Sequence, residues 1–487
     1  MLFNSVGFAI FFPVVVIIYF LIEQNISSLR ALRAGNLWLL AASYFYYMCQ
    51  GPVYALLLFS VTLITYICGS IAGNRLHTLS VRRAALAAGT AAALSMLFFF
   101  KYFSFACRII GADPALKIIL PVGISFYIFQ SLTYIFDAYK GDTEPEHDFL
   151  KYALFVSFFP VLLAGPIERS KNLLRQFDDL HSFDYTRTRH GLIRIMYGLF
   201  LKIVIAQRLS IAVDLIYDNY SDCTGYQLLL GTVLYAFQIY CDFDSYSSIA
   251  TGCAEIMGFR LTENFRQPFF AVSCADLWRR WHVSLNSWFR DYLYIPLGGG
   301  RVPKWRKYLN IMIVFTTSGL WHGADWTYII WGALSGLFQV LGEILKPFRI
   351  AVLKRLPLHS TFTHKCHHIL QILITFGLFS TSLIFFRSGD LNAALTITGK
   401  IFTRFSFASI LTTSPFSLGL GVKNLLFLLF SLAILFIYDL INEKTGDAAA
   451  LIASESTPVR WCVYYIFTLM IIASASLGTQ QFIYFKF

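Results

Sequence analysis

Two histidines, His282 and His322, stand in Trp-rich and largely apolar sequence, whereas the other eight of the ten fall in or beside hydrophilic connectors. His322 lies in the run Ser318-Gly-Leu-Trp-His-Gly-Ala-Asp-Trp, which is otherwise apolar enough to enter a bilayer. An ionisable group at membrane depth needs partners or a water-filled cavity, so it predicts a functional site. Burial would keep such an imidazole neutral and able to accept a proton. Both histidines are therefore candidates for acid–base chemistry.

His282 belongs to the stretch 265–301, which is too polar to span a membrane. Ser273 followed by Asp276 predicts a helix that starts just before Leu277, with an Asp276–Arg280 pair one turn apart. One face of that helix would carry Trp278, Trp281, His282, Leu285 and Phe289, with Asn286 one turn after His282. Two locations fit such a helix. It could lie on the membrane surface as an anchor, or be buried as a re-entrant element that lines a cavity.

The composition predicts an all-α polytopic membrane protein, because 57% of residues are hydrophobic and only 14% are charged. A helical span needs about 20 apolar residues, which predicts roughly 11 to 13 membrane segments here. We expect re-entrant or interfacial helices around a central cavity, and a single domain over residues 1–487. The apolar runs are 6–22, 53–72, 84–100, 118–136, 152–164, 191–206, 228–240, 311–320, 369–386, 425–441 and 463–477.

The net charge of +12 is concentrated in connectors and does not indicate a nucleic-acid partner. Basic loops at 75–83, 301–307 and 346–355 are placed on the cytoplasmic face by the positive-inside rule, so the partner they predict is the lipid bilayer. The nine cysteines contain no Cys-x-x-Cys pair. His364, Cys366, His367 and His368 cluster in a connector without a nearby carboxylate, and a tetrahedral site needs four well-placed ligands. We therefore expect no bound metal.

Other charged residues in apolar runs are more typical of structural pairing than of chemistry. Asp242 and Asp244 share one span, and Glu168 and Arg169 adjoin at the end of another. Such groups commonly pair with each other or cap a broken helix. Lys202 is predicted to be a snorkelling or bundle-facing charge.

These motifs together resemble the membrane-bound O-acyltransferases, specifically the bacterial branch that includes the alginate O-acetylation membrane subunit and the D-alanyl transfer protein of teichoic acid modification. The similarity is carried by 276–299, 318–327, 120–130, 164–169 and the terminal Gln481-Phe-Ile-Tyr-Phe-Lys-Phe. One departure concerns the pattern Asp-Phe-Ser-Gly-Tyr-Ser-Asp, which here has Asp244 as an extra acid and Ser248 in place of the last aspartate. That departure leaves any shared role of the final carboxylate open.

The resemblance implies roles for the candidate residues. His322 matches the family's catalytic histidine and would be the general base, while His282 would orient or polarise the donor carbonyl, with Asn286 assisting. Arg279, Arg280 and Arg290 would contact the donor's phosphate or form structural pairs. Asp242, Trp281 and Trp321 complete the predicted substrate-binding set. An unactivated cysteine nucleophile is disfavoured, because the sequence shows nothing that would lower a thiol pKa.

The implied reaction moves an acyl group, with acetyl favoured, from an activated cytoplasmic donor to hydroxyls of an exported cell-envelope polysaccharide. The donor would be acyl-CoA or an acyl carrier protein, with no tightly bound cofactor. The transfer would be direct or pass through an exported serine-hydrolase-like acyltransferase partner, at the bacterial cytoplasmic (inner) membrane. D-alanyl transfer to teichoic acid is the alternative within the family. A polysaccharide transporter would be expected to show repeated halves, which the sequence lacks, and a scaffold leaves both histidines unexplained.

Overall fold

The computed structural model describes residues 1–25, 28–112, 118–355, 361–406, 408, 419–475 and 482–483. Within those ranges all regular structure is helical, as expected for a chain whose backbone must satisfy its own hydrogen bonds in lipid. Gln481 and residues 484–487 of the terminal motif lie outside the described residues. The predicted all-α class is confirmed.

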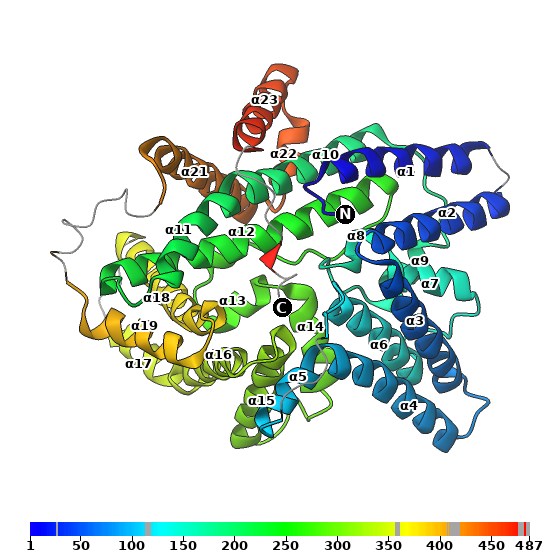
Figure 1. Ribbon diagram of the computed structural model, residues 1–487, viewed down its shortest axis with the longest axis horizontal. Coiled ribbons are helices and arrows are strands. Elements are labelled where there is room, and N and C mark those ends of the chain that lie inside the picture. The colour runs from blue at the N-terminus through cyan, green and yellow to red at the C-terminus, as the bar shows by residue number, and fades with distance from the viewer. Residues whose placement is uncertain are drawn as a thin grey trace.

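The first part of the chain forms helices that lie together (Figure 1). They are α1 (Val6–Asn25), α2 (Ser28–Met48), α3 (Pro52–Gly73), α4 (Leu79–Leu97), the π-helical turn η1 (Phe98–Tyr102), α5 (Phe103–Ile109), α6 (Ile124–Lys140), α7 (Phe149–Ser157), α8 (Phe159–Leu162) and α9 (Ser170–Gln176).

The middle of the chain contains the candidate residues. Its elements are α10 (Tyr185–Leu199), the π-helical turn η2 (Phe200–Ala206), α11 (Gln207–Asp218), α12 (Gly225–Met257), η3 (Pro268–Phe270), α13 (Cys274–Arg280), α14 (Val283–Phe289), η4 (Arg290–Tyr294), α15 (Lys304–His322) and α16 (Trp326–Ile344). The last part comprises α17 (Lys346–Arg355), α18 (Thr361–Arg387), α19 (Leu391–Thr403), α21 (Val422–Thr445), α22 (Ala448–Ser454) and α23 (Thr457–Ser474).

Seven helical segments in the described ranges are long and apolar enough to cross a membrane, which makes the protein multi-pass. The predicted runs 191–206, 228–240 and 311–320 also form helices, but these fall short of the length or hydropathy of a clear span. The count of 11 to 13 segments therefore stays a prediction, as does the single domain. The seven are Val6–Gln24, Pro52–Gly73, Leu79–Ile109, Trp326–Ile344, Phe362–Arg387, Val422–Thr445 and Thr457–Ser474.

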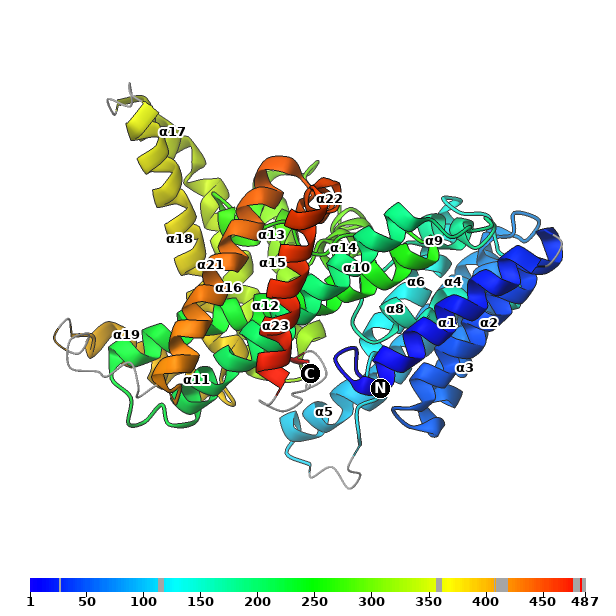
Figure 2. The ribbon, with the colours of Figure 1, turned by 90° about the horizontal axis from the view of Figure 1, so that it is seen from above.

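Figure 2 shows α1 to α4 gathered at one end of the molecule, while α11, α18, α19 and α21 lie at the other. The long helix α12 runs between them and packs along α10, α11 and α18. A buried apolar cluster that extends in sequence from Phe3 to Phe482 joins the two ends. The last described residues lie in the middle of the molecule (Figure 1), where Phe482 packs against Tyr246 of α12.

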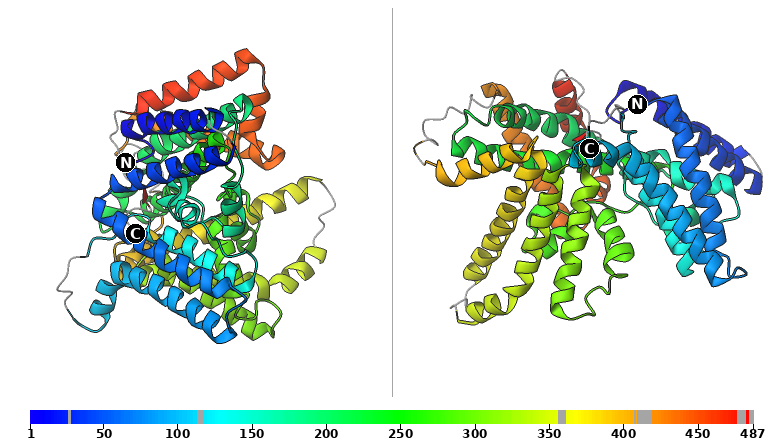
Figure 3. Two further views of the ribbon diagram at one scale, coloured as in Figure 1. Left: turned by 90° about the vertical axis from the view of Figure 1, so that its right-hand side faces the viewer. Right: turned by 60° about the horizontal axis from the view of Figure 1, so that its bottom comes forward.

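Three long helices, α15, α16 and α18, lie side by side (Figure 3, right). α15 and α16 approach most closely where Gly319 meets Gly332. A Cβ on Gly319 would come within 2.3 Å of the Tyr328 carbonyl oxygen, and one on Gly332 within 2.3 Å of the Phe315 carbonyl oxygen. Small residues allow such backbone contact between helices. This contact fixes the end of α15, where His322 lies.

Candidate active site

His322 is the last residue of α15, which gives way there to the extended Gly323. Its side chain is buried in an aromatic surround. The imidazole meets Trp321 at 4.9 Å, Trp331 of α16 at 5.0 Å and Phe386 of α18 at 5.4 Å between ring centroids, each nearly edge-on. Residues from three helices therefore hold this one ring.

His282 lies at a break between two short helices, so the predicted continuous helix is wrong. α13 ends at Arg280, and His282 has φ +44°, in the left-handed region that non-glycine residues rarely adopt. The Asn286 side-chain amide donates to the carbonyls of Trp278 and Trp281, at 3.0 Å for Trp278. An amide that bonds these carbonyls competes with helical continuation. The break aims the imidazole inward.

The start of α13 agrees with the sequence analysis. The Ser273 hydroxyl accepts a hydrogen bond from the Asp276 amide at 3.2 Å, and Arg280 pairs with Asp276 at 3.1 Å, as predicted. Leu277 and Leu285 are buried in the same core as the histidines. Of the two locations considered for this segment, the structure therefore has the buried one.

The Trp321 ring contacts both histidines. Its ring centroid is 6.1 Å from that of His282 and 4.9 Å from that of His322, and Phe243 of α12 covers His282 at 4.6 Å. Burial lowers the pKa of His282 to about 3. Burial, together with His282 and the Lys101 ammonium, holds the pKa of His322 well below its usual range. Both imidazoles are therefore neutral at physiological pH, as a general base must be.

Trp281 and Asp242, two of the predicted substrate-binding residues, each contact other parts of the core. Trp281 is buried against Phe265 and Phe379. Asp242 forms a buried ion pair with Lys202 and accepts a hydrogen bond from the backbone N–H of Ile483 at 2.6 Å. Lys202 thus faces the bundle, one of the two predicted options. The Lys202–Asp242 pair also lines a cavity of about 360 Å³.

Arg279, Arg290 and Asn286 line one cavity of about 480 Å³, together with Lys307. The Arg279 and Arg290 side chains are exposed, and their carboxylate partners are close in sequence, Asp276 at 3.6 Å and Asp291 at 2.8 Å. Exposed pairs of this kind contribute little stability. The structure therefore leaves these guanidinium groups accessible to an anionic ligand.

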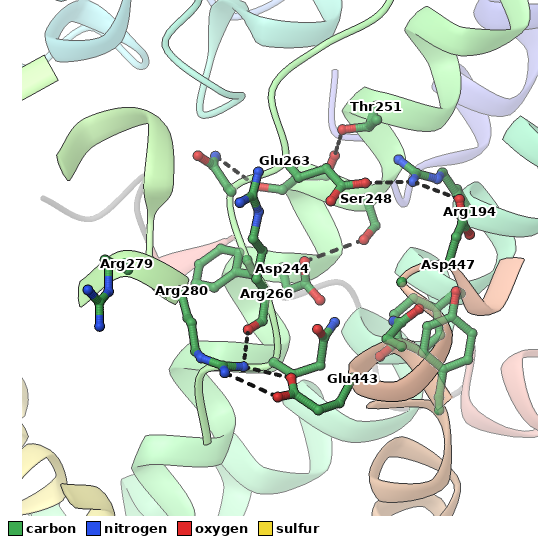
Figure 4. Close-up of a pocket in the computed structure, with 18 of the residues that line it drawn as sticks. Arg194, Asp244, Ser248, Thr251, Glu263, Arg266, Arg279, Arg280, Glu443 and Asp447 are labelled. Carbon is green, nitrogen blue, oxygen red and sulfur yellow. Dashed lines mark hydrogen bonds and ion pairs between the residues drawn. The ribbon is translucent and has the colours of Figure 1, made fainter. Parts of the chain in front are cut away.

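A larger cavity, of about 600 Å³, also borders α13 and shares Arg279 with the cavity of about 480 Å³ (Figure 4). Its charges are largely paired with each other, Arg194 with Glu263 at 2.7 Å and Arg280 with Glu443 at 2.6 Å. Of the two roles considered for Arg280, phosphate contact and structural pairing, the ion pair with Glu443 therefore favours the second. The departure from the family pattern also lies here, with the Ser248 hydroxyl 3.4 Å from an Asp244 carboxylate oxygen.

Glu168 and Arg169 have the structural roles predicted for them. The Glu168 carboxylate accepts a hydrogen bond from the Thr262 amide, and burial raises the pKa of Glu168 to about 7. Arg169 pairs with Asp291 at 3.0 Å and stacks over the Tyr292 ring. The loop that contains Glu168 and Arg169 therefore stabilises η4 through the contacts of Arg169.

The sequence analysis missed Lys101 and Tyr102. The partly buried Lys101 ammonium donates to the Trp321 carbonyl at 2.6 Å, and the Tyr102 hydroxyl donates to the Leu320 carbonyl at 3.0 Å. Lys101 shares a small cavity of about 20 Å³ with His322. Its position in the run Phe-Phe-Phe-Lys-Tyr-Phe was the available signal, because the argument that selected the histidines applies equally to a lysine in apolar sequence.

Residues 145–381 match the model of the MBOAT, membrane-bound O-acyltransferase, family. The chain is 35% identical over 414 residues to the probable alginate O-acetylase of Pseudomonas putida, covering 82% of this chain and 80% of that protein. The chain belongs to the membrane-bound O-acyltransferase family. It is therefore an acyltransferase.

Two further relatives represent other branches of the family. The peptidoglycan O-acetyltransferase of Helicobacter pylori is 33% identical over 436 residues, covering 82% of this chain and 79% of that protein. The teichoic acid D-alanyltransferase of Bacillus subtilis is 28% identical over 258 residues, covering 50% of this chain and 63% of that protein. Both histidines lie inside the stretch that matches the membrane-bound O-acyltransferase model, whereas Lys101 precedes it.

Proposed function

We propose that this membrane-bound O-acyltransferase transfers an acetyl group from an activated cytoplasmic donor toward hydroxyls of an exported cell-envelope polysaccharide. The observation that carries the proposal is the pair of buried imidazoles, His282 and His322, which both contact the Trp321 ring. Two relatives that match 82% of this chain are named for O-acetylation, one of alginate and one of peptidoglycan. Acetyl transfer is favoured over D-alanyl transfer, because the D-alanyltransferase match covers only half of the chain.

In the proposed reaction His322 removes the proton of the attacking hydroxyl. The hydroxyl oxygen forms a bond to the acyl carbon, the carbon–sulfur bond of the thioester breaks, and the thiolate takes the proton from the His322 imidazolium. His282 orients or polarises the donor carbonyl, where negative charge develops. Neutral imidazoles suit this sequence, because a protonated His322 has no lone pair with which to accept the proton.

The donor is acyl-CoA or an acyl carrier protein, and no tightly bound cofactor is required. Arg279, Arg290 and Lys307 line a cavity beside Asn286, and guanidinium groups bind phosphate well. Lys307 lies in the first turn of α15, at the end of the basic stretch 301–307 that the positive-inside rule places in the cytoplasm, and it pairs with Glu343 at 2.7 Å. We therefore assign this cavity to the phosphate-bearing part of the donor.

We place the protein in the bacterial cytoplasmic (inner) membrane, where the donor is on one side and the polymer on the other. The described chain consists of helices and connectors, and an exported serine-hydrolase-like partner is proposed to hold the polymer or to receive the acyl group. Proteoliposomes with acetyl-CoA inside and polysaccharide outside test this, because full acetylation without a partner would contradict it.

The base assignment is tested in cells that lack the gene and carry His322→Ala, His282→Ala or His77→Ala. Loss of one acid–base group costs at least about 10²-fold, so His322→Ala abolishes glycan acetylation measured by mass spectrometry. His282→Ala gives a graded loss, and the exposed connector variant His77→Ala keeps wild-type acetylation. Wild-type acetylation by His322→Ala at matched protein level rejects the assignment. If His282→Ala is inactive and His322→Ala is active, the roles assigned to the two histidines have to be exchanged.

A further inference from the structure

The carbonyl end of α15 is held by side chains from a distant part of the chain. Gly323 donates its backbone N–H to the Gly319 carbonyl, but the next two carbonyls, of Leu320 and Trp321, follow the last helical hydrogen bond. Tyr102 and Lys101 donate to these two carbonyls in turn. Two consecutive residues of η1 therefore finish the helix that ends in His322.

The contact continues past the histidine. Arg108 of α5 donates to the Ala324 carbonyl at 3.3 Å and lies 3.7 Å from the Asp325 carboxylate. The η1–α5 segment thus follows the backbone from Leu320 to Asp325 with three side chains. π-Helical turns are frequent at functional sites, and η1 brings both Lys101 and Tyr102 to the same helix end.

We propose that Lys101 is a positioning residue of the acyl-transfer site, which fixes the Trp321–His322 backbone and holds a positive charge beside the His322 imidazole. The proposal rests on His322 being the base of the proposed function. The ammonium lies 5.5 Å from the centroid of the Trp321 ring and lines the same small cavity as His322. Its other hydrogen-bond acceptor is the Ser125 hydroxyl at 3.3 Å.

The lysine charge is directed to the site because no carboxylate pairs with it in the described part of the chain. Its acceptors are a carbonyl and a hydroxyl, both neutral. Ion pairing does not explain a lysine at this partly buried position, so we assign a use to its charge at the site. A positive charge close to an imidazole disfavours protonation and keeps the base in its active form.

Other charged and titratable groups also face His322. His282 approaches from the α13–α14 break, and Tyr328 of α16 packs against Phe386, which touches the imidazole. Asp325 and Arg387 line a cavity together with Tyr328 and Phe386. The charged groups that act on His322 are His282 and Lys101.

The test compares Lys101→Met, Lys101→Arg and the matched control Tyr102→Phe in isolated membranes supplied with radiolabelled acetyl-CoA. Misplacing the base makes Lys101→Met lose at least about tenfold in kcat, while KM for acetyl-CoA changes by less than about threefold. The acid limb of its pH–rate profile moves upward by about one pH unit, because the neighbouring cation no longer opposes protonation of His322. Lys101→Arg keeps the positive charge, so the acid limb of its pH–rate profile stays at the wild-type position.

Tyr102→Phe removes one neutral hydrogen bond from the same turn, so kcat falls by less than about threefold and the limb does not move. If Lys101→Met does not accumulate, Lys101→Gln replaces it, since Gln keeps a donor without the charge. A wild-type kcat, or a loss of kcat with an unmoved acid limb, overturns the proposal. His322→Ala is measured in parallel: an active His322→Ala means that the base assignment has failed, whereas an inactive one with wild-type Lys101→Met means that only the lysine proposal has.

Discussion

Two π-helical turns, η1 and η2, each carry a lysine, buried at Lys202 and partly buried at Lys101, and the two lysines have different partners. Lys202 of η2 pairs with the Asp242 carboxylate and lies 4.1 Å from the centroid of the Phe482 ring. Lys101 of η1 donates to the neutral carbonyl of Trp321 beside His322. The same local geometry therefore serves two purposes. One lysine is paired with a carboxylate and joins helices, and the other has neutral acceptors and is proposed to carry its charge next to the proposed base.

The difference shows that burial alone does not identify a functional charge. Lys202 and Asp242 were both recognisable in the sequence as ionisable residues in apolar runs, yet they neutralise one another across 40 residues of chain. What separates Lys101 is the nature of its acceptor. A cation without a counter-ion exerts an electrostatic field on neighbouring groups.

Breaking the Lys202–Asp242 pair has the largest expected effect on stability. Removing one member of a buried ion pair leaves an uncompensated charge and costs about 3–5 kcal/mol. Lys202→Met therefore lowers the unfolding temperature in detergent and the amount of protein in the membrane. The double variant Lys202→Met/Asp242→Asn regains much of this loss. If the double variant is as unstable as the single one, the pair is not what holds the two helices.

The turn that carries His282 is expected to be sensitive to Asn286. Asn286→Ala frees the Trp278 and Trp281 carbonyls in a buried region, which costs about 1–3 kcal/mol and lowers kcat by displacing His282. Asn310 is a matched control, since its amide also donates to two carbonyls, Leu297 at 3.1 Å and Gly299 at 3.2 Å, but far along α15 from His322. Asn310→Ala should lose stability and keep kcat. Equal losses of kcat in both variants would contradict a positioning role for Asn286.

A third cation, His190, extends the comparison to the pH dependence of stability. Hydrogen bonds to Asp447 at 3.1 Å and Glu255 at 2.6 Å raise its pKa to about 9. Because the folded-state pKa lies above the ordinary value, this stabilisation is complete below about pH 6.5 and is lost as the pH rises through about 9. His190→Gln should therefore destabilise the protein at pH 6.5 and change little at pH 10, as measured by thermal unfolding. A difference that grows with pH would refute the pairing.

The smallest effect concerns the backbone at His282. Both His282→Ala and His282→Gly remove the imidazole, but only glycine adopts φ +44° without strain. His282→Gly should be more stable than His282→Ala by about 1 kcal/mol, with equally low activity. Equal unfolding temperatures would mean that the turn relaxes in the variants and is not imposed by its surroundings.

The fold class and the two histidines could be predicted because each depends on local composition. Apolar runs define helices in lipid, and an ionisable residue in such a run is visible without a structure. The break at His282 could not be predicted, since it depends on where the Asn286 amide lies relative to two carbonyls. The pairing of Asp242 with Lys202 could not be predicted either, because the two residues are 40 positions apart in the sequence. Lys101 was visible but overlooked, because its run was interpreted only as a membrane span.

The η1–α5 contact has a consequence for exchanging parts between members of this family. The stretch that matches the family model begins at residue 145 and contains both histidines, but the three side chains that grip the end of α15 come from residues 101–108. A chimera that transplants only the matched stretch would combine His322 from one protein with the residues 101–108 that contact the end of α15 from another. Exchanges intended to alter specificity should therefore move residues 98–109 together with α15.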